Sequence, residues 1–301
     1  LDLMKDHDLD VLIATGPENV AYVADYECLT HWLNKGTPVV ALLPADRSIA
    51  PTLITLALEA FSLAERPSWI EDVRLHGTSL TQIGVQVGSG RLEERDREMV
   101  DRCFGAPRHQ GWLEVLTSAV IEKGLAEARI GLDESGLTST QWQQVLGALP
   151  KARISPAADV LRRIRMVKTP AELERLRRSN EITEAALAEL LEAIEPGANE
   201  RDLVRLYNGR VAQLGGIPGL TLVTAGRRSG HAHAVTADYR LQKGDVVKID
   251  LGCSFEHYWS DTARLKVVGE PSEEVVIAYN AILAGEQAAV NAIRPGVRPS
   301  E

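Results

Sequence analysis

Two aspartates in one predicted hairpin are the residues best suited to chemistry. The segment GDVVKIDLGCSFEHYWSDTARLKVVG, residues 244–269, has the composition of an antiparallel hairpin that turns near Phe255 and Glu256. A turn there places Asp250 directly opposite Asp261 on one face of the sheet, with Cβ atoms about 4.5 to 5.5 Å apart. Carboxylates that close repel each other unless a divalent cation or a shared proton neutralises them. The pair predicts a site for two divalent cations that activate water, whereas an asymmetric turn would leave at least one aspartate facing solvent.

The same register makes predictions for two neighbouring residues. Gly252 should lie opposite Trp259, where the missing side chain leaves room for the indole. Cys253 alternates to the face opposite Asp250, so it is predicted to be a small core residue rather than a nucleophile.

The elements that must position this hairpin belong to the second of two predicted lobes, since 301 residues exceed the usual size of one hydrophobic core. Residues 1–156 alternate strand-like and helix-like segments, which predicts an α/β domain. Residues 157–301 read as a helix pair, then a sheet, then a helix, which predicts an α+β domain. The first lobe's strand-like runs are VLIAT (11–15), TPVVALL (37–43) and RIGLDE (129–134), its helix-like segments are ITLALEAFSLAE (54–65) and WLEVLTSAVIEKGLAEA (112–128), and its charged stretch 87–107 is predicted to face solvent.

Two helices near the junction have recognisable starts. Thr169 and Glu172 form a capping box around Pro170, which predicts a long helix toward Glu195. Asn199 is predicted to cap a second helix through the segment ERDLVRLYNGRVAQL. The later segments TLVTAG, DVVKIDLGC and HYWSDTARLKVVG are predicted strands, and EEVVIAYNAILAGEQAAVNAI is a predicted helix.

The hairpin resembles the metal-binding hairpin of the pita-bread metallopeptidase family, which includes Xaa-Pro dipeptidases (prolidases), Xaa-Pro aminopeptidases, methionine aminopeptidases and the creatinase branch. The resemblance rests on Gly244-Asp245, Ile249-Asp250-Leu251-Gly252, Tyr258, Ser260-Asp261 and His233, which lies seventeen residues before Asp250. Upstream, Arg165-Met166-Val167-Lys168-Thr169-Pro170 and the segment LDVLIATGPENVAYVADY (9–26) also resemble that family. The resemblance implies an incomplete pita-bread catalytic domain at 157–301, preceded by a ribonuclease-H-like α/β amino-terminal domain at 1–156.

The family resemblance also implies roles for individual residues. Asp250 would chelate one of two divalent ions, Mn, Co or Zn, and Asp261 would bridge both, while a metal-bound hydroxide attacks a peptide bond next to proline. His233 would lie at the cleft edge and hydrogen-bond the substrate or the developing oxyanion. His231 matches no family ligand and is a loop residue with a possible substrate contact. Arg227 and Arg228 near the cleft would favour a substrate carboxylate, although solvated arginines are an equal alternative.

Three further ligands of the family, one His and two Glu, would come from roughly the next hundred residues, which this sequence does not contain, and hard cations need several well-placed oxygens. We therefore expect the 301-residue chain to bind metal weakly and to be inactive. It starts at Leu1 rather than Met and stops in the Pro/Gly-rich IRPGVRPSE, so we expect both ends to be cut.

Two other functions stay open. One is a creatinase-like or ectoine-hydrolase-like enzyme that cleaves a C–N bond in a small nitrogenous metabolite, such as a small amide substrate, and the other is a non-catalytic pita-bread module that binds peptides or proteins. Members of the two-domain branch commonly dimerise through the first lobe, so the resemblance also implies a homodimer acting on a short Xaa-Pro peptide.

Composition narrows the partners and the compartment. The formal charge of −9 and the pI near 5.4 argue against nucleic acid, because phosphate binding needs clustered Lys and Arg. The sequence contains no run of about 18 apolar residues, so it predicts no membrane-spanning helix. Three widely spaced cysteines, Cys28, Cys103 and Cys253, fit a reducing compartment, which predicts a cytoplasmic location.

Overall fold

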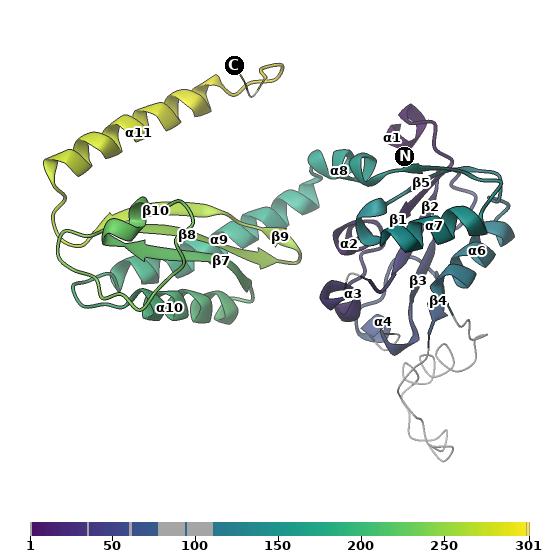
Figure 1. Ribbon diagram of the computed structural model, residues 1–301, viewed down its shortest axis with the longest axis horizontal. Helices are drawn as coiled ribbons and strands as arrows, with labels where there is room; N and C mark the ends of the chain where they lie inside the picture. Colours follow the sequence, from purple (N-terminus) through teal and green to yellow (C-terminus); the bar gives the residue numbers. More distant parts are fainter. Residues whose placement is uncertain are drawn as a thin grey trace, which may run out of the picture. The chain divides into compact units, whose positions relative to one another are not determined.

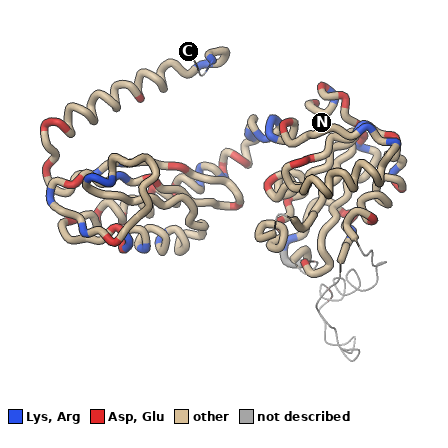
Figure 2. Tube along the Cα trace, in the orientation of Figure 1, with Lys and Arg blue, Asp and Glu red and all other residues tan. Residues whose placement is uncertain are grey.

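The computed structural model describes residues 2–34, 36–59, 62–77, 94, 111–298 and 300. The chain divides into two compact units, Leu1–Val167 and Lys168–Glu301, which are described separately (Figure 1). The predicted solvent-facing stretch 87–107 lies outside the described residues except for residue 94, and Cys103 lies outside them too. Acidic and basic residues are interleaved along the described parts of both units rather than gathered by sign (Figure 2).

A six-stranded mixed sheet forms the centre of the first unit. Its strands lie in the order β4-β3-β2-β1-β5-β6, with β2 antiparallel to both β1 and β3 and the other pairs parallel. The strands are β1 (Val11–Ala14), β2 (Val40–Pro44), β3 (Thr52–Leu56), β4 (Asp72–His76), β5 (Arg129–Leu132) and β6 (Arg153–Pro156). The helices are α1 (Asp2–Asp6), α2 (Pro17–Ala24), α3 (Leu29–Leu33), α4 (Ser62–Glu65), α6 (Trp112–Glu122), α7 (Ser139–Ala148) and α8 (Ala158–Met166), with short 3₁₀ turns at Ala57–Glu59 and Glu134–Gly136.

The central strand β1 is buried on both faces, which explains its unbroken apolar sequence. Leu12 and Ala14 pack into a core with residues of α1, α2 and α8. Val11 and Ile13 pack into a second core with residues of α6 and α7. The predicted α/β fold of the amino-terminal domain is therefore confirmed.

Two details of the first unit differ from the sequence-based expectation. The segment 54–65 is not one helix, because Ile54, Thr55 and Leu56 complete strand β3 and only the residues after them turn helically. Apolar residues at helical spacing are indistinguishable from a short buried strand in such a run. The predicted domain boundary after residue 156 lies before α8, whereas Val160 and Leu161 of α8 belong to the first core.

The second unit begins with two helices whose starts agree with the sequence pattern. Helix α9 (Pro170–Glu192) carries the complete capping box, in which the Glu172 amide donates to Thr169 Oγ1 and the Thr169 amide donates to Glu172 Oε2. Helix α10 (Glu200–Gln213) is capped by Asn199, whose side chain accepts from the Arg201 amide. Both predicted caps are confirmed.

The sheet of the second unit has the order β10-β8-β7, with β9 paired to β8 at the hairpin end. All of its strand pairs are antiparallel. The strands are β7 (Ile217–Ala225), β8 (Val246–Phe255), β9 (Tyr258–Trp259) and β10 (Thr262–Val267), with a 3₁₀ turn at Gly226–Gly230 after β7.

Helices α9 and α10 cover one face of this sheet (Figure 1). Val247, Ile249, Leu251 and Cys253 alternate along β8 into their shared core, so the prediction that Cys253 is a small core residue is confirmed. The intervening residues of β8, which include Asp250, face away from the helices.

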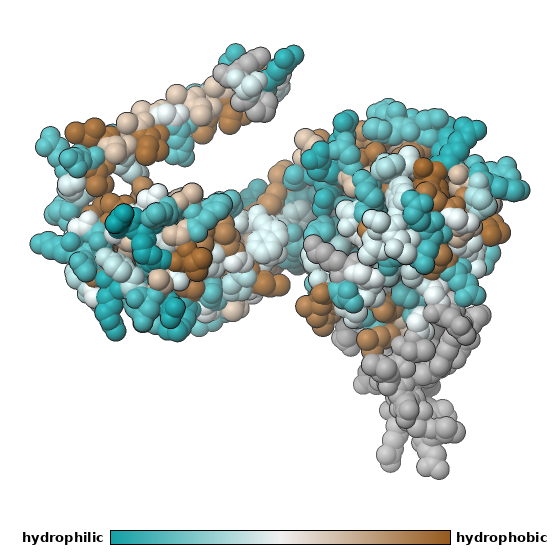
Figure 3. All heavy atoms as spheres, in the orientation of Figure 1, coloured by the Kyte–Doolittle hydropathy of each residue, from teal (hydrophilic) through white to brown (hydrophobic). Residues whose placement is uncertain are grey.

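The last helix, α11 (Glu273–Ala292), has no buried residue and presents apolar side chains to solvent (Figure 3). Within the described ranges, no helix combines the length and the apolar character needed to cross a bilayer.

Candidate metal centre

The hairpin turns one residue later than the sequence predicts. Glu256 and His257 occupy the turn between Phe255 and Tyr258, which pair with each other. Both turn residues have positive φ, 46° and 71°. Positive φ at two central positions belongs to a type I′ turn, whose twist matches that of the flanking strands. Moving the turn by one residue shifts the register of the hairpin by two positions.

The shifted register gives both aspartates new partners. Asp250 pairs with Ala263, so the prediction that it directly opposes Asp261 is wrong. Continuing the register places Asp261 opposite Gly252, and a Cβ built on Gly252 would lie 3.7 Å from the Asp261 Cα. Asp250 and Gly252 are two residues apart on β8 and share a face. The two aspartates are therefore diagonal neighbours on that face, at about 7 to 8 Å.

Burial supports this placement of Asp261 even though it lies in the short break between β9 and β10. The residues on either side, Ser260 and Thr262, are buried against the helices. Asp261 itself is exposed, as expected for the outward member of an alternating run. Asp250 is half-buried on the same outward face.

Two glycines make room for neighbouring groups in the hairpin, but the glycine that accommodates the Trp259 indole is not the predicted one. Trp259 pairs with Ser254 rather than Gly252, and its indole lies over Gly219, where an added Cβ would meet the ring at 1.9 Å. The predicted Gly252–Trp259 pairing is wrong for the same reason as the aspartate pairing. Gly252 instead accommodates the backbone of Ser260, whose carbonyl oxygen would lie 2.2 Å from an added Cβ.

A buried network of hydroxyl groups fixes the residue before Asp261. Ser260 Oγ lies 2.7 Å from Thr183 Oγ1 and accepts from the Cys253 amide at 3.0 Å. Thr183 also lies 3.2 Å from the Tyr207 hydroxyl, and Ser179 donates to the Cys253 carbonyl at 2.9 Å. These contacts tie the strand break to α9 and α10, so the position of Asp261 depends on both helices.

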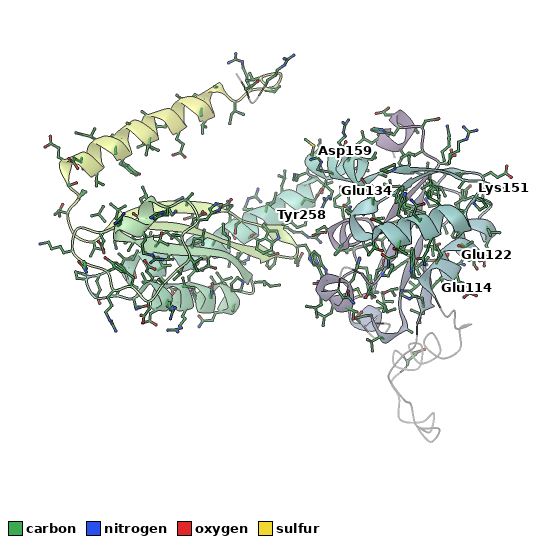
Figure 4. All side chains as sticks on the ribbon, in the orientation of Figure 1. Glu114, Glu122, Glu134, Lys151, Asp159 and Tyr258 are labelled. Carbon is green, nitrogen blue, oxygen red and sulfur yellow. The ribbon has the colours of Figure 1, made fainter. Side chains whose placement is uncertain are left out.

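Tyr258 fastens the hairpin tip to the start of α9 (Figure 4). Its hydroxyl donates to Glu172 Oε1 at 3.1 Å, and the Arg175 guanidinium lies over its ring. Burial acts to raise the pKa of Glu172, but hydrogen bonds from Thr169 and Tyr258 outweigh it and leave that pKa below its ordinary value. The carboxylate is thus held ionised, as a helix cap requires.

The loop that carries the two predicted histidines is held close to the Asp250 face. Lys248, two residues before Asp250, donates from Nζ to the carbonyl of His231 and, at 2.8 Å, to the carbonyl of Ala232. His231 and His233 both have exposed side chains. The structure thus brings the backbone of this loop to the outward face of β8.

Glu200 anchors the same loop from α10. Its fully buried carboxylate accepts from the amides of Ala225 and Ala237, each at 2.8 Å, and pairs with Arg228 at 2.6 Å. Arg228 also donates to the carbonyl of Val235. Its guanidinium is therefore already engaged within the loop, and the predicted contact with substrate stays a prediction.

Arg227, by contrast, is exposed and has no hydrogen bond or ion pair within the part of the chain that the structure describes. Sequence reasoning missed Glu200 and Lys248. The only signal for Glu200 is an acid directly after a helix cap, and the only signal for Lys248 is a charge that alternates with Asp250 along a strand.

The two aspartates fit part of a divalent-metal site. Both carboxylates project from one face, and neither has a hydrogen bond or ion pair to any described residue, so their oxygens are available to a hard cation. The described residues contain no group of three or more His, Cys, Asp or Glu side chains placed to hold a metal ion. Asp250 and Asp261 would therefore supply two carboxylates to such a site, and no third His, Cys, Asp or Glu side chain among the described residues is grouped with them.

Family models match almost the whole chain. The model described as the Creatinase/Prolidase N-terminal domain matches residues 1–167, and the model described as Metallopeptidase family M24 matches residues 174–301. Asp250, Asp261 and His233 all lie within the second match.

Individual relatives agree with the family models. The chain is 34% identical over 145 residues to a Xaa-Pro dipeptidase of Pyrococcus furiosus, a match that covers 48% of this chain and 42% of that protein. It is 34% identical over 154 residues to a probable dipeptidase PepE of Mycobacterium tuberculosis, covering 50% of this chain and 40% of that protein. The matched part thus spans less than half the length of these relatives.

Solved structures show the same fold. An X-Pro aminopeptidase from Thermotoga maritima superimposes with a TM-score of 0.74 at 20% identity, over 99% of this chain and 73% of the other. The prolidase from Pyrococcus horikoshii superimposes with a TM-score of 0.71 at 23% identity, over 98% and 71%. The predicted two-domain architecture is confirmed at the level of fold.

Proposed function

The chain belongs to the metallopeptidase family M24 and carries that family's creatinase/prolidase amino-terminal domain, and on this basis we propose that the protein hydrolyses the peptide bond next to proline in short peptides. Asp250 and Asp261 are the metal-binding residues of this proposal. The Xaa-Pro dipeptidase of Pyrococcus furiosus, 34% identical over 145 residues, supports the choice of substrate class.

The observation that carries the proposal is the pair of aspartates on one outward sheet face, without other partners among the described residues. Divalent ions bound there would supply Lewis-acid activation of water and of the scissile carbonyl. Asp250 comes from a continuous strand with a buried core face, and Asp261 follows a serine fixed by the hydroxyl network. Rigid supports of this kind hold ligands in place without rearrangement during the reaction.

His233 is proposed to donate a hydrogen bond to the substrate or to the oxyanion that develops at the carbonyl carbon. Its exposure and the fixed backbone on both sides of it suit a group that must reach a bound peptide. His231 and Arg227 are proposed to contact the substrate's charged ends, since both are exposed on the same loop.

We expect the 301-residue chain by itself to bind Mn²⁺, Co²⁺ or Zn²⁺ weakly and to lack activity, because two carboxylates leave most positions around a hard cation to water. The experiment assays the full-length product of the natural gene, the natural protein, beside the 301-residue chain. Each is assayed with the three metals against Ala-Pro, a longer Xaa-Pro peptide and creatine. Hydrolysis of a Xaa-Pro bond by the natural protein, abolished by chelator and restored by metal, is the expected result.

Substitution of the aspartates tests their role directly. Asp250→Asn and Asp261→Asn should each reduce kcat/KM by about a hundredfold or more, because several kcal/mol of charge stabilisation are lost. Asp202→Asn is the matched control, since Asp202 lies on the exposed surface of α10 and its carboxylate pairs with Arg205 alone among the described residues. Cleavage of creatine alone, or no turnover by the metal-loaded natural protein, would contradict the peptidase proposal.

A homodimer and a cytoplasmic location belong to the same proposal. Cys28 and Cys253 are free and buried, which suits a reducing compartment. Light scattering of the purified natural protein gives its mass directly, and a monomeric mass at micromolar concentration would contradict the dimer.

A further inference from the structure

We propose that Lys248 is a positioning residue, which clamps the backbone before His233 against the sheet face that carries Asp250. The inference rests on the proposed function, because its purpose is to set the distance between the histidine and the metal-binding strand. It concerns a residue that has no role in the hydrolysis as described above.

The geometry of the clamp follows from strand alternation. Lys248 and Asp250 are two residues apart on β8, so their side chains leave the same face about 6.6 to 6.8 Å apart along the strand. The Lys248 ammonium reaches across to the carbonyls of His231 and Ala232, the two residues directly before His233. An ammonium donating to two successive carbonyls restrains the backbone between them.

The other side of His233 is restrained independently. Thr236 Oγ1 accepts from the Val223 amide at 3.2 Å and donates to the Val223 carbonyl at 3.1 Å, which joins the loop to the free edge of β7. The next amide, that of Ala237, donates to buried Glu200. Without Lys248, the restraints described here would hold the loop at Arg228, before the two histidines, and at Thr236 and Ala237, after them.

Burial shows that the outward face of the sheet is covered beside Lys248. Thr224, which pairs with Lys248 across the strands and shares its face, is fully buried although its hydroxyl has no hydrogen-bond partner among the described residues. A residue on the outward face becomes buried only where something lies on it. Lys248 thus binds the loop carbonyls beside a covered part of the outward face.

The same contact also keeps the positive charge of Lys248 from pairing with the Asp250 carboxylate. A lysine this close to Asp250 competes with a metal ion for the carboxylate if its ammonium is free to swing toward it. The two carbonyls draw the ammonium to the loop side, and no ion pair joins Lys248 to Asp250 in the described part of the molecule. The same contact therefore orders the histidine loop and leaves Asp250 open.

Hydrogen exchange of the 301-residue chain tests the clamp without requiring activity. In Lys248→Met, the amide of His231, which donates to the Arg228 carbonyl at 3.1 Å, should exchange at least about tenfold faster, because the charge-assisted bonds to the loop are lost. Lys248→Arg, which retains a cation of similar reach, should restore most of the protection. Lys243→Met is the matched control, since Lys243 lies in the turn before β8 and contacts neither the loop carbonyls nor Asp250.

Mn²⁺ alone provides the second readout. In the unsubstituted chain, Mn²⁺ should broaden the NMR signals of Asp250 and Asp261 together with those of the His233 ring. In Lys248→Met, broadening of the aspartates should persist while that of the ring falls by at least about twofold, because paramagnetic broadening decreases steeply as a loosened loop moves away. Equal ring broadening in both proteins would overturn the proposal.

The remaining outcomes separate the clamp from the peptidase proposal. If Mn²⁺ broadens no signal in the unsubstituted chain, the metal site fails, and the exchange of the His231 amide still decides whether Lys248 holds the loop. If Lys248→Met also loses protection at Ile249 and Leu251 in the core, that variant is not folded. Lys248→Gln then takes its place in the test, since the shorter glutamine side chain cannot reach both carbonyls. Unchanged loop exchange in the folded variant overturns the inference.

Discussion

Asp133 shows at the scale of one residue how the first unit stabilises a buried charge. Its carboxylate, fully buried after β5, accepts from the Thr15 and Gly16 amides at 3.1 and 2.8 Å and from the Asn19 side chain at 2.7 Å. The Ser135 amide and hydroxyl donate to its other oxygen. Burial acts to raise the pKa of Asp133, and these donors outweigh it, so that the pKa lies below the ordinary value of 3.8.

The depressed pKa predicts a specific acid sensitivity. Because the folded pKa is lower than the unfolded one, the stabilisation is complete above about pH 4 and is lost as pH falls through the folded value. Asp133→Asn should lower the free energy of unfolding by about 2 to 4 kcal/mol at pH 7 and by less near pH 3. Urea unfolding at both pH values measures this, with exposed Asp6→Asn as control. Equal losses at the two pH values would contradict the charged role.

At the scale of the element, the break between β9 and β10 depends on one glycine. The carbonyl of Ser260 lies 2.2 Å from where a Cβ of residue 252 would stand, and a backbone atom cannot move aside as a flexible side chain does. Gly252→Ala should therefore displace Ser260 and Asp261 together. Asp261 lies in this break, so the path of the backbone there sets the position of its carboxylate on the outward face of the sheet.

This displacement gives a prediction for both stability and metal binding. Gly252→Ala should lower the free energy of unfolding by about 1 to 3 kcal/mol, the usual range for overpacking, and should weaken Mn²⁺ binding measured by NMR broadening at Asp261. Gly209→Ala is the control, because Gly209 lies in α10 and an added Cβ would meet no described atom within 4 Å outside the adjacent backbone of the helix. That change should stabilise the helix by about 0.5 to 1 kcal/mol. Unaltered Mn²⁺ binding in Gly252→Ala would show that the break tolerates a side chain.

At the scale of the whole molecule, the two cores of the first unit share no residue with the core of the second, which predicts two separately folding units. The first unit includes α8, and Val160 and Leu161 of this helix, together with its cap residue Ala157, enter the core around β1. A fragment of residues 1–167 should unfold cooperatively in urea. A fragment of residues 1–156, which ends at the boundary expected from sequence, should be less stable by about 3 kcal/mol or more because that apolar surface is lost. Equal stability would place the boundary before α8.

The local features of this protein were readable from its sequence. Apolar alternation identified β8, the spacing of Thr169 and Glu172 identified the start of α9, and Asn199 identified the start of α10. Each depends on residues a few positions apart, whose interactions do not require the rest of the fold. The same kind of reasoning predicted a metal-binding role for Asp250 and Asp261 from their type and spacing, whereas the role predicted for His233 came from the family resemblance.

Only the tertiary structure decided how those residues meet. The positive φ of Glu256 and His257 moved the turn and made Asp250 and Asp261 diagonal rather than opposed. The contact of Lys248 with the carbonyl of His231 joins residues seventeen apart. Such contacts depend on which distant segments the tertiary fold brings together. Buried or partly buried polar groups bond to the partners that packing places within hydrogen-bonding distance, and no short sequence pattern specifies those partners.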